Sequence, residues 1–127
     1  MTYAKKNLRE VPDSAPKFGL GDVQEARFPR EDLGAEQVGL NFLAIKPGKR
    51  EGFAHRHEKA EEVYVVLGGS GRVKLDDDLV DLAPLDAVRV APGTARSFEA
   101  GSDGLEVLIF GARFAGDGEP VPDFWDA

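Results

Sequence analysis

The sequence contains no cysteine, one tryptophan, one methionine and two histidines among its 127 residues. The absence of cysteine excludes a disulfide framework, a thiol nucleophile and a zinc–thiolate site. No apolar run is long enough to cross a membrane, and none follows the basic residues near the start of the chain. We therefore expect a cytoplasmic protein without a secretory signal, a membrane span or a membrane partner.

Positive charge is also scarce, with 16 Lys and Arg against 23 Asp and Glu and a net charge of -7. Such a surface repels phosphate backbones and anionic lipids, so we expect no nucleic-acid partner. Hydrophobic residues make up 42% of the chain and charged residues 31%, which is typical of a globular domain. The length suits one domain with one hydrophobic core.

Long helical periods are missing as well, and 15 glycines and 8 prolines supply frequent turns. Short runs rich in β-branched and apolar residues follow one another from residue 38 onward. Runs expected to be strands are 38–46, 62–67, 72–75, 79–82, 87–90, 95–100 and 105–110, with glycine-rich turns at 68–71 and 101–104. Many short strands at close spacing predict an all-β sandwich or barrel.

The two ends of the chain differ from this central part. Residues 1–34 mix charge and proline without a sustained period and predict an N-terminal arm, before a barrel at 35–115. Residues 116–127 form a Gly- and Pro-rich C-terminal tail that we expect to leave the barrel as a loop. Its aromatic pair, Phe124 and Trp125, is expected to dock on a partner subunit, so we predict a homodimer.

Both histidines of the chain lie together as His55-Arg56-His57. The two-residue period of a strand places both imidazoles on one face. Glu62 follows at the start of the next apolar run, where its carboxylate can meet both rings. Two imidazoles and one carboxylate suit a divalent first-row metal ion such as Fe, Mn, Ni or Zn and leave coordination positions open.

These residues resemble the first motif of the cupin family, which has a glycine, two histidines one residue apart, a glutamate four or five residues on, and a further glycine. The matching positions are Gly48, His55, His57, Glu62 and Gly69. The loop between Gly48 and His55 is one residue longer than the family usually has. Glu61 also satisfies the spacing, but the apolar, glycine-rich turn that follows it favours Glu62 as the ligand.

The stretch 85–98 resembles the second cupin motif, with Asp86, an alternating strand, Pro92-Gly93 and Phe98. The position of the third histidine ligand holds Arg96 instead, a permanent cation that cannot bind a metal. The resemblance covers residues 38–110. It implies a single cupin-type double-stranded β-helix, a jelly-roll barrel, with an N-terminal arm and a short C-terminal tail.

Arg96 leaves two arrangements open. If its guanidinium points inward, it can pair bidentately with Glu62, replace the ion and leave the barrel metal-free. If it lies at the cavity mouth, the metal keeps three protein ligands and Arg96 becomes a clamp for a substrate carboxylate or phosphate. Tyr64 shares a strand face with Glu62 and is a candidate general acid or substrate contact.

Two classes of function follow. The resemblance implies a small single-domain cupin that binds a divalent metal, a small anionic molecule, or both, and acts as a metal-dependent oxygenase or isomerase. The alternative is a non-catalytic, metal-free small-molecule-binding or interaction module, in which Arg96 replaces the usual third histidine. The sequence does not decide between an enzyme and a binding module, because a shared fold indicates where a site lies but not which reaction occurs there.

Overall fold

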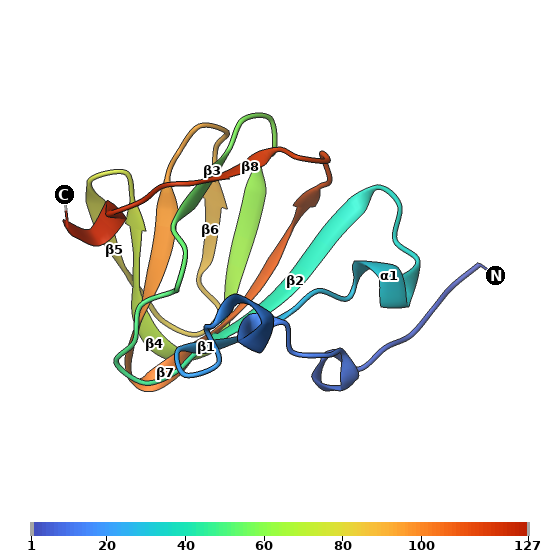
Figure 1. The fold of residues 1–127 in the computed structure, drawn as a ribbon, viewed down its shortest axis with the longest axis horizontal. Coiled ribbons are helices and arrows are strands. Elements are labelled where there is room, and N and C mark those ends of the chain that lie inside the picture. The colour runs from blue at the N-terminus through green and yellow to red at the C-terminus, as the bar shows by residue number, and fades with distance from the viewer. Residues whose placement is uncertain (1, 127) are drawn as a thin grey trace.

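The computed structural model describes residues 2–126 and contains one curled, antiparallel sheet (Figure 1). Its strands are β1 (Gln24–Arg27), β2 (Val38–Ile45), β3 (His55–His57), β4 (Glu62–Leu75), β5 (Asp78–Leu82), β6 (Ala87–Val90), β7 (Arg96–Ala112) and β8 (Gly118–Pro120). The helical turns are η1 (Leu8–Glu10), η2 (Ala15–Phe18), α1 (Arg30–Leu33) and η3 (Phe124–Asp126). None of the helices among the described residues is long and apolar enough to cross a membrane.

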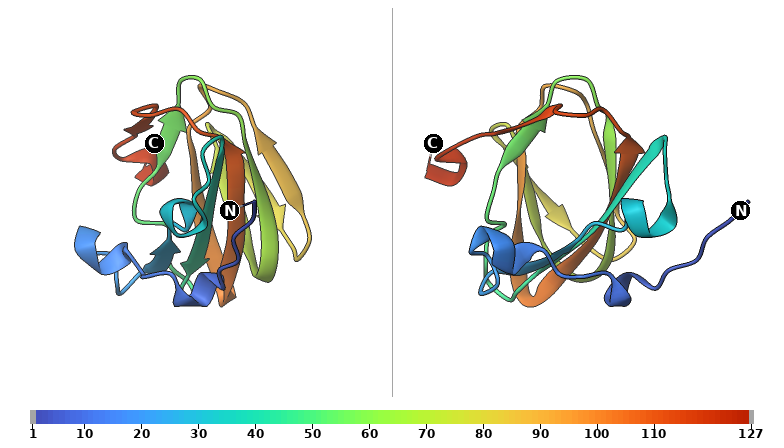
Figure 2. Two further views of the ribbon diagram at one scale, coloured as in Figure 1. Left: turned by 90° about the vertical axis from the view of Figure 1, so that its right-hand side faces the viewer. Right: turned by 45° about the vertical axis from the view of Figure 1, so that its right-hand side comes forward.

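Strands β4 and β7 run through the whole barrel and pair with each other at both ends. Residues 62–69 of β4 pair with 105–111 of β7, and residues 71–75 pair with 96–100. One half of the sheet therefore has the order β1-β2-β7-β4-β6 and the other β8-β3-β7-β4-β5. The two halves curve around a common axis (Figure 2), and this confirms the all-β jelly-roll barrel.

The predicted turns at 68–71 and 101–104 were wrong, because β4 and β7 continue through both segments. Register shifts between Val66 and Gly68 and between Gly69 and Gly71 mark bulges where the paired strands bend. A Cβ atom on Gly69 would collide with the carbonyl of Gly104, and one on Gly71 with the carbonyl of Glu99. These glycines therefore permit a close approach of two backbones at a bend, and they do not end the strands.

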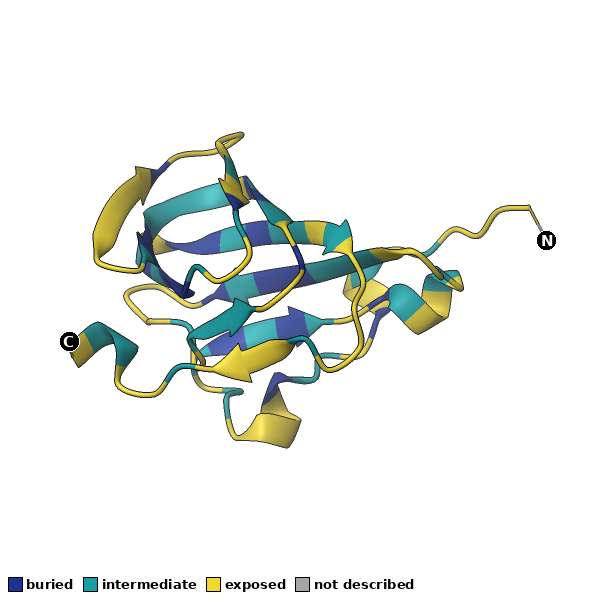
Figure 3. Cartoon of the chain, turned by 90° about the horizontal axis from the view of Figure 1, so that it is seen from above, coloured by how far each residue is buried: buried dark blue, intermediate teal, exposed yellow. Residues whose placement is uncertain are grey.

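Buried and less buried residues alternate along the strands, as a sheet with one face toward a core requires (Figure 3). The inward residues of β4 and β7 form the centre of the core. Its members include Leu43, Ile45, Tyr64, Val66, Val73, Leu82, Val90, Phe98, Leu105 and Val107. Each such side chain contributes roughly 1.5–3 kcal/mol by its burial.

Both terminal segments add a strand to the barrel. β1, within residues 1–34, pairs with β2, and β8, within residues 116–127, pairs with β3. The aromatic tail docks on its own chain, which corrects its expected place on a partner subunit. Trp125 Nε1 donates to Ser97 Oγ at 3.0 Å, and the Arg50 guanidinium lies 4.6 Å from the Trp125 ring centre. Lys74 Nζ donates to the carbonyl of Phe124 and completes the anchor.

Candidate functional site

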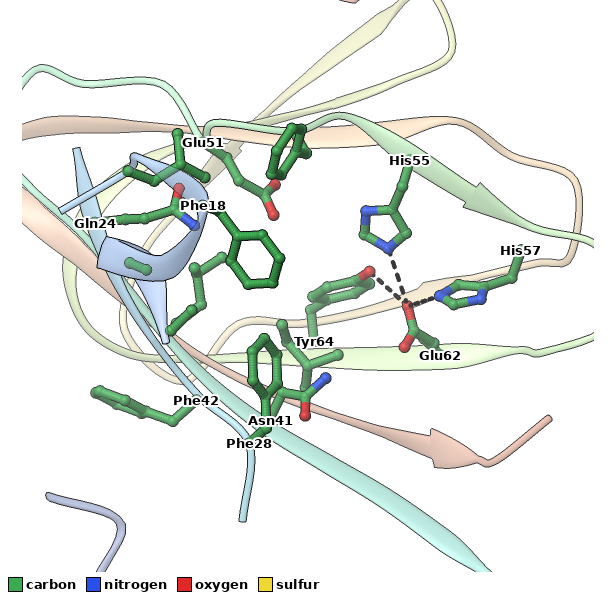
Figure 4. A pocket seen from close by; sticks show the side chains of 16 residues that line it. Phe18, Gln24, Phe28, Asn41, Phe42, Glu51, His55, His57, Glu62 and Tyr64 are labelled. Carbon is green, nitrogen blue, oxygen red and sulfur yellow. Dashed lines mark hydrogen bonds and ion pairs between the residues drawn. The ribbon is translucent and has the colours of Figure 1, made fainter. Parts of the chain in front are cut away.

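The site begins with the short strand β3, whose residue His55 is the register partner of Arg96 on β7. His55 and His57 face the barrel interior, with ring centres 5.0 Å apart in an edge-to-face arrangement. Their Nε2 atoms lie 3.8 Å and 3.3 Å from Oε1 of Glu62, which starts β4 (Figure 4). The structure thus brings together the three residues that the sequence motif selected.

The same oxygen of Glu62 has two further partners. The Tyr64 hydroxyl donates to it at 2.7 Å, and Arg96 Nη2 donates to it at 2.9 Å. Arg96 Nε donates to the Tyr64 hydroxyl at 3.0 Å, and Nη1 donates to the carbonyl of Thr94 at 2.7 Å. Arg96 is fully buried. It therefore adopts the inward arrangement, although one nitrogen rather than two reaches Glu62.

This network sets the charge states of its members. Burial alone would raise the pKa of Glu62, but hydrogen bonding from His55, His57 and Tyr64 holds that pKa well below its usual range. Glu62 is therefore a carboxylate at neutral pH. Burial and the negative charge of Glu62 raise the pKa of Tyr64 well above its ordinary value, so its phenol stays protonated.

The cluster can be tested for its fit to a metal ion. Ligand atoms from His55, His57 and Glu62 all lie within 4.8 Å of one another, so this group could hold an ion. The charge around Glu62 is less suited to a metal ion, because the Arg96 guanidinium already donates a hydrogen bond to the same carboxylate oxygen at 2.9 Å. A divalent ion at that oxygen would be repelled by a buried, permanent cation. The spacing suits a metal ion, and the electrostatics do not.

Asp117, in the C-terminal tail, also belongs to the site and was missed from the sequence. Its Oδ2 lies 3.4 Å from Nδ1 of His57, a buried ring nitrogen without a hydrogen bond. The carboxylate also accepts hydrogen bonds from the backbone N–H groups of Glu58, Lys59 and Ala60. Those backbone bonds and the Coulomb attraction of His57 lower the pKa of Asp117 against the opposing effect of desolvation. His57 therefore lies between two carboxylates, one facing each ring nitrogen.

The cluster forms one end of a cavity of about 340 Å³, at the lower end of the size range of small-molecule sites. Glu51 and Gln24 also line the cavity, and Figure 4 shows the Glu51 carboxyl group between Gln24 and His55. The rest of the wall is mainly apolar and aromatic. It includes Phe18, Leu20, Phe28, Phe42, Leu43, Phe53 and Ile109, with Asn41 as a polar member near Tyr64.

Glu51 was the second functional candidate that sequence reasoning missed. Although the residue as a whole is only partly buried, its carboxyl group is enclosed by the protein, and this burial raises its pKa to about 8. The charge of Glu62 raises the pKa further, while the Phe98 N–H and Arg96 oppose the rise. The only available signal was the longer loop before His55, which contains Glu51.

Glu61, the competing glutamate of the motif, lies outside the site. Its carboxylate pairs with Arg89, and both side chains are more than half exposed, at 55% and 63%. The choice of Glu62 as the inward residue therefore agrees with the structure.

The chain is similar to known proteins in sequence family and in fold. The family model described as "Cupin domain" matches residues 41–110. A cupin protein from Bacteroides fragilis has a TM-score of 0.71 at 20% identity, covering 91% of this chain and 88% of that one. A sugar phosphate isomerase of the cupin superfamily from Silicibacter pomeroyi has a TM-score of 0.72 at 17% identity, covering 94% and 82%.

Oxalate decarboxylase from Bacillus subtilis has a TM-score of 0.68 at 22% identity over 81% of this chain, which spans only 29% of that protein. No curated protein matches the sequence. Identities this low show the shared fold, and the named activities differ from one another. The reaction must therefore be argued from the residues of the site.

Proposed function

Because the chain belongs to the Cupin domain family, we propose that its barrel binds a small molecule and exchanges protons with it through His55, His57 and Glu62 without a metal ion. The observation that carries this proposal is the buried contact between Arg96 Nη2 and Glu62 Oε1 at 2.9 Å. Arg96 supplies the positive charge that an ion would otherwise supply. A direct contact between Arg96 and a ligand is not part of the proposal, since each guanidinium nitrogen already has a partner.

The proposed chemistry is proton transfer of the isomerase type. Imidazole is the side chain best suited to exchange a proton near neutral pH, and both imidazoles line the cavity. Glu62 stabilises positive charge on either ring from 3.3 Å and 3.8 Å, and Asp117 supports His57 from the other side. Tyr64 holds Glu62 in place and, with its raised pKa, stays protonated.

Elemental analysis of protein purified without added metal or chelator tests this proposal. We expect less than stoichiometric iron, manganese, nickel and zinc in the wild type. Arg96→His removes the competing cation and adds a fourth protein ligand, so its metal affinity should rise by about tenfold or more. One tightly held equivalent of metal in the wild type would overturn the proposal.

A second candidate function is a metal-dependent enzyme such as an oxygenase or isomerase, favoured by the close grouping of His55, His57 and Glu62. These three residues would hold the ion, which would supply Lewis-acid or redox chemistry. His57→Ala should then abolish metal binding, because a two-ligand remnant rarely holds a first-row ion against water. Stoichiometric metal in the wild type that is lost in His57→Ala would establish this candidate.

A homodimer remains part of the proposal, on a different surface from the tail. Leu40, Phe110 and Val63 are successive register partners across β2, β7 and β4, and Phe110 is 38% exposed. Leu67, four residues farther along β4 than Val63, is 46% exposed. A second copy of the chain could cover these side chains. Sedimentation of the wild type and of Phe110→Glu tests this, and monomers in both samples at micromolar concentration would contradict it.

A further inference from the structure

The cavity is lined by apolar, aromatic and acidic side chains and by the two histidines. Among the residues that line it, Glu51 and Glu62 are acidic, and none is Lys or Arg. The expectation of an anionic ligand depended on an arginine at the cavity mouth, but the structure buries Arg96 behind Tyr64 and Glu62. Nothing in the lining offers a carboxylate or phosphate a positive partner other than a protonated histidine.

Glu51 lacks a cationic partner. No ion pair joins it to another residue in the range 2–126, and its side chain accepts one weak hydrogen bond, from the backbone N–H of Phe98 at 3.3 Å. Glu62 differs, because Arg96 and Tyr64 satisfy it. A carboxyl group enclosed in an apolar cavity is costly to ionise without a positive neighbour, which agrees with its raised pKa of about 8.

Aromatic rings surround this end of the cavity. Phe18 and Phe53 meet edge to face, with ring centres 6.3 Å apart, and both remain about half exposed at 58% and 52%. Phe28 and Phe42 line the wall beyond them. The faces of aromatic rings carry negative charge density and attract organic cations. The net charge of -7 adds a long-range attraction for cations.

From these observations we propose that the cavity takes an organic amine with an apolar body, its ammonium group on Glu51 and its body against the phenylalanines. This inference rests on the proposed small-molecule function and names the class of ligand. Gln24 supports the site, because its Oε1 accepts from the Gly52 N–H at 2.8 Å and so fixes the loop next to Glu51. The ammonium group of the ligand supplies the positive partner that the Glu51 carboxyl group lacks. The other end of the molecule then lies toward His55 and His57.

Three probes with the same ring and different charge test the inference: 2-phenylethylamine, 2-phenylethanol and phenylacetate. Affinities are measured at neutral pH by titration calorimetry and by amide chemical shifts. We expect the amine to bind about tenfold or more tighter than the alcohol, and phenylacetate to bind weakest. Glu51→Gln should remove the advantage of the amine and leave the affinity for the alcohol unchanged. Glu36→Gln, an exposed residue outside the cavity, is the matched control.

Equal binding of amine and alcohol, tighter binding of phenylacetate, or an amine preference that survives Glu51→Gln would each overturn the inference. Failure of all three probes to bind at millimolar concentration would also overturn it. His57→Ala separates the two proposals. It should keep the preference for the amine, since Glu51 and not His57 is proposed to contact the ammonium group, whereas the proposed proton transfer requires His57.

Discussion

Asp117 and His57 meet across the pairing of β8 with β3, with Oδ2 of the carboxylate 3.4 Å from the buried Nδ1 of the ring. The two groups are within ion-pair distance, although the ring nitrogen makes no hydrogen bond. The next residue, Gly118, is the register partner of His57, and a Cβ there would lie 3.3 Å from the ring. Glycine at position 118 therefore leaves room for the His57 ring beside the tail.

Asp117 should act as a positioning residue for His57. In the wild type at neutral pH we expect Nδ1 to carry a proton directed at Asp117, because the tautomer follows the acceptor that the ring nitrogen faces. Asp117→Ala removes this acceptor, so the tautomer of His57 with its proton on Nδ1 should no longer be preferred. Long-range ¹⁵N spectra of the imidazole ring measure this change. Glu119→Gln changes an exposed carboxylate in the same tail and should leave the spectrum unchanged. Identical ring shifts in Asp117→Ala and the wild type would show that Asp117 only caps the loop at residues 58–60.

Breaking the buried pair of Arg96 and Glu62 should be strongly destabilising. Arg96→Ala leaves an unpaired carboxylate inside the barrel and should lower the free energy of unfolding by about 3–5 kcal/mol. Arg89→Ala removes an exposed pair with Glu61 and should cost less than about 1 kcal/mol. Urea denaturation measures both. Adding Glu62→Gln to Arg96→Ala should restore part of the loss, and a double variant no more stable than Arg96→Ala would argue against charge burial as the cause.

Glu51 should make the fold less stable as pH rises. Its pKa is about 8 in the folded protein against an ordinary value of 4.5, so the native state binds more protons between these values. The stabilising contribution is complete below the unfolded pKa and is lost as pH rises through about 8. Between about pH 5 and pH 8, ionisation of Glu51 should lower the melting temperature of the wild type by several degrees. Glu51→Gln should lack this decrease. Parallel curves for Glu51→Gln and wild type across this range would mean that the carboxyl is not protonated in the cavity.

The bend of the two long strands should not tolerate a side chain at Gly71. A Cβ there would overlap the carbonyl of Glu99, so Gly71→Ala should cost about 1–3 kcal/mol or more. Gly39→Ala, whose nearest contact would be an ordinary 3.5 Å, is the matched control and should be nearly neutral. Thermal unfolding compares them. A Gly71→Ala variant as stable as Gly39→Ala would show that the strands can part at the bend without loss.

The sequence identified the residues of the site that lie in local motifs. His55, His57 and Glu62 are close in the chain, and their spacing together with the resemblance to the cupin motifs selected the group whose ligand atoms the structure brings within 4.8 Å of one another. The orientation of Arg96 could not be predicted, because the inward and outward arrangements share the same strand position. The inward orientation of Arg96 depends on Tyr64 and Thr94, whose oxygen atoms accept hydrogen bonds from its other two nitrogens.

Asp117 and Glu51 could not be found from local patterns. Asp117 reaches His57 through a three-residue strand in a segment rich in glycine and proline, where no alternation signals pairing. Glu51 lies in a loop, where contacts with the distant residue Phe98 hold it at the cavity. The glycines at 68–71 were wrongly predicted as turns because glycine at a turn and glycine at a close strand crossing give the same sequence signal.

The continuity of β4 and β7 has a consequence for ligand size. Both strands belong to both halves of the sheet, so neither half can tilt outward without changing the bulges between Val66 and Gly68 and between Gly69 and Gly71. The bulges therefore contribute to the curvature of the barrel wall at a distance from the lining side chains. Proteins with the same His-His-Glu motif but a different bulge pattern would accept ligands of a different width, even with every residue of the wall unchanged.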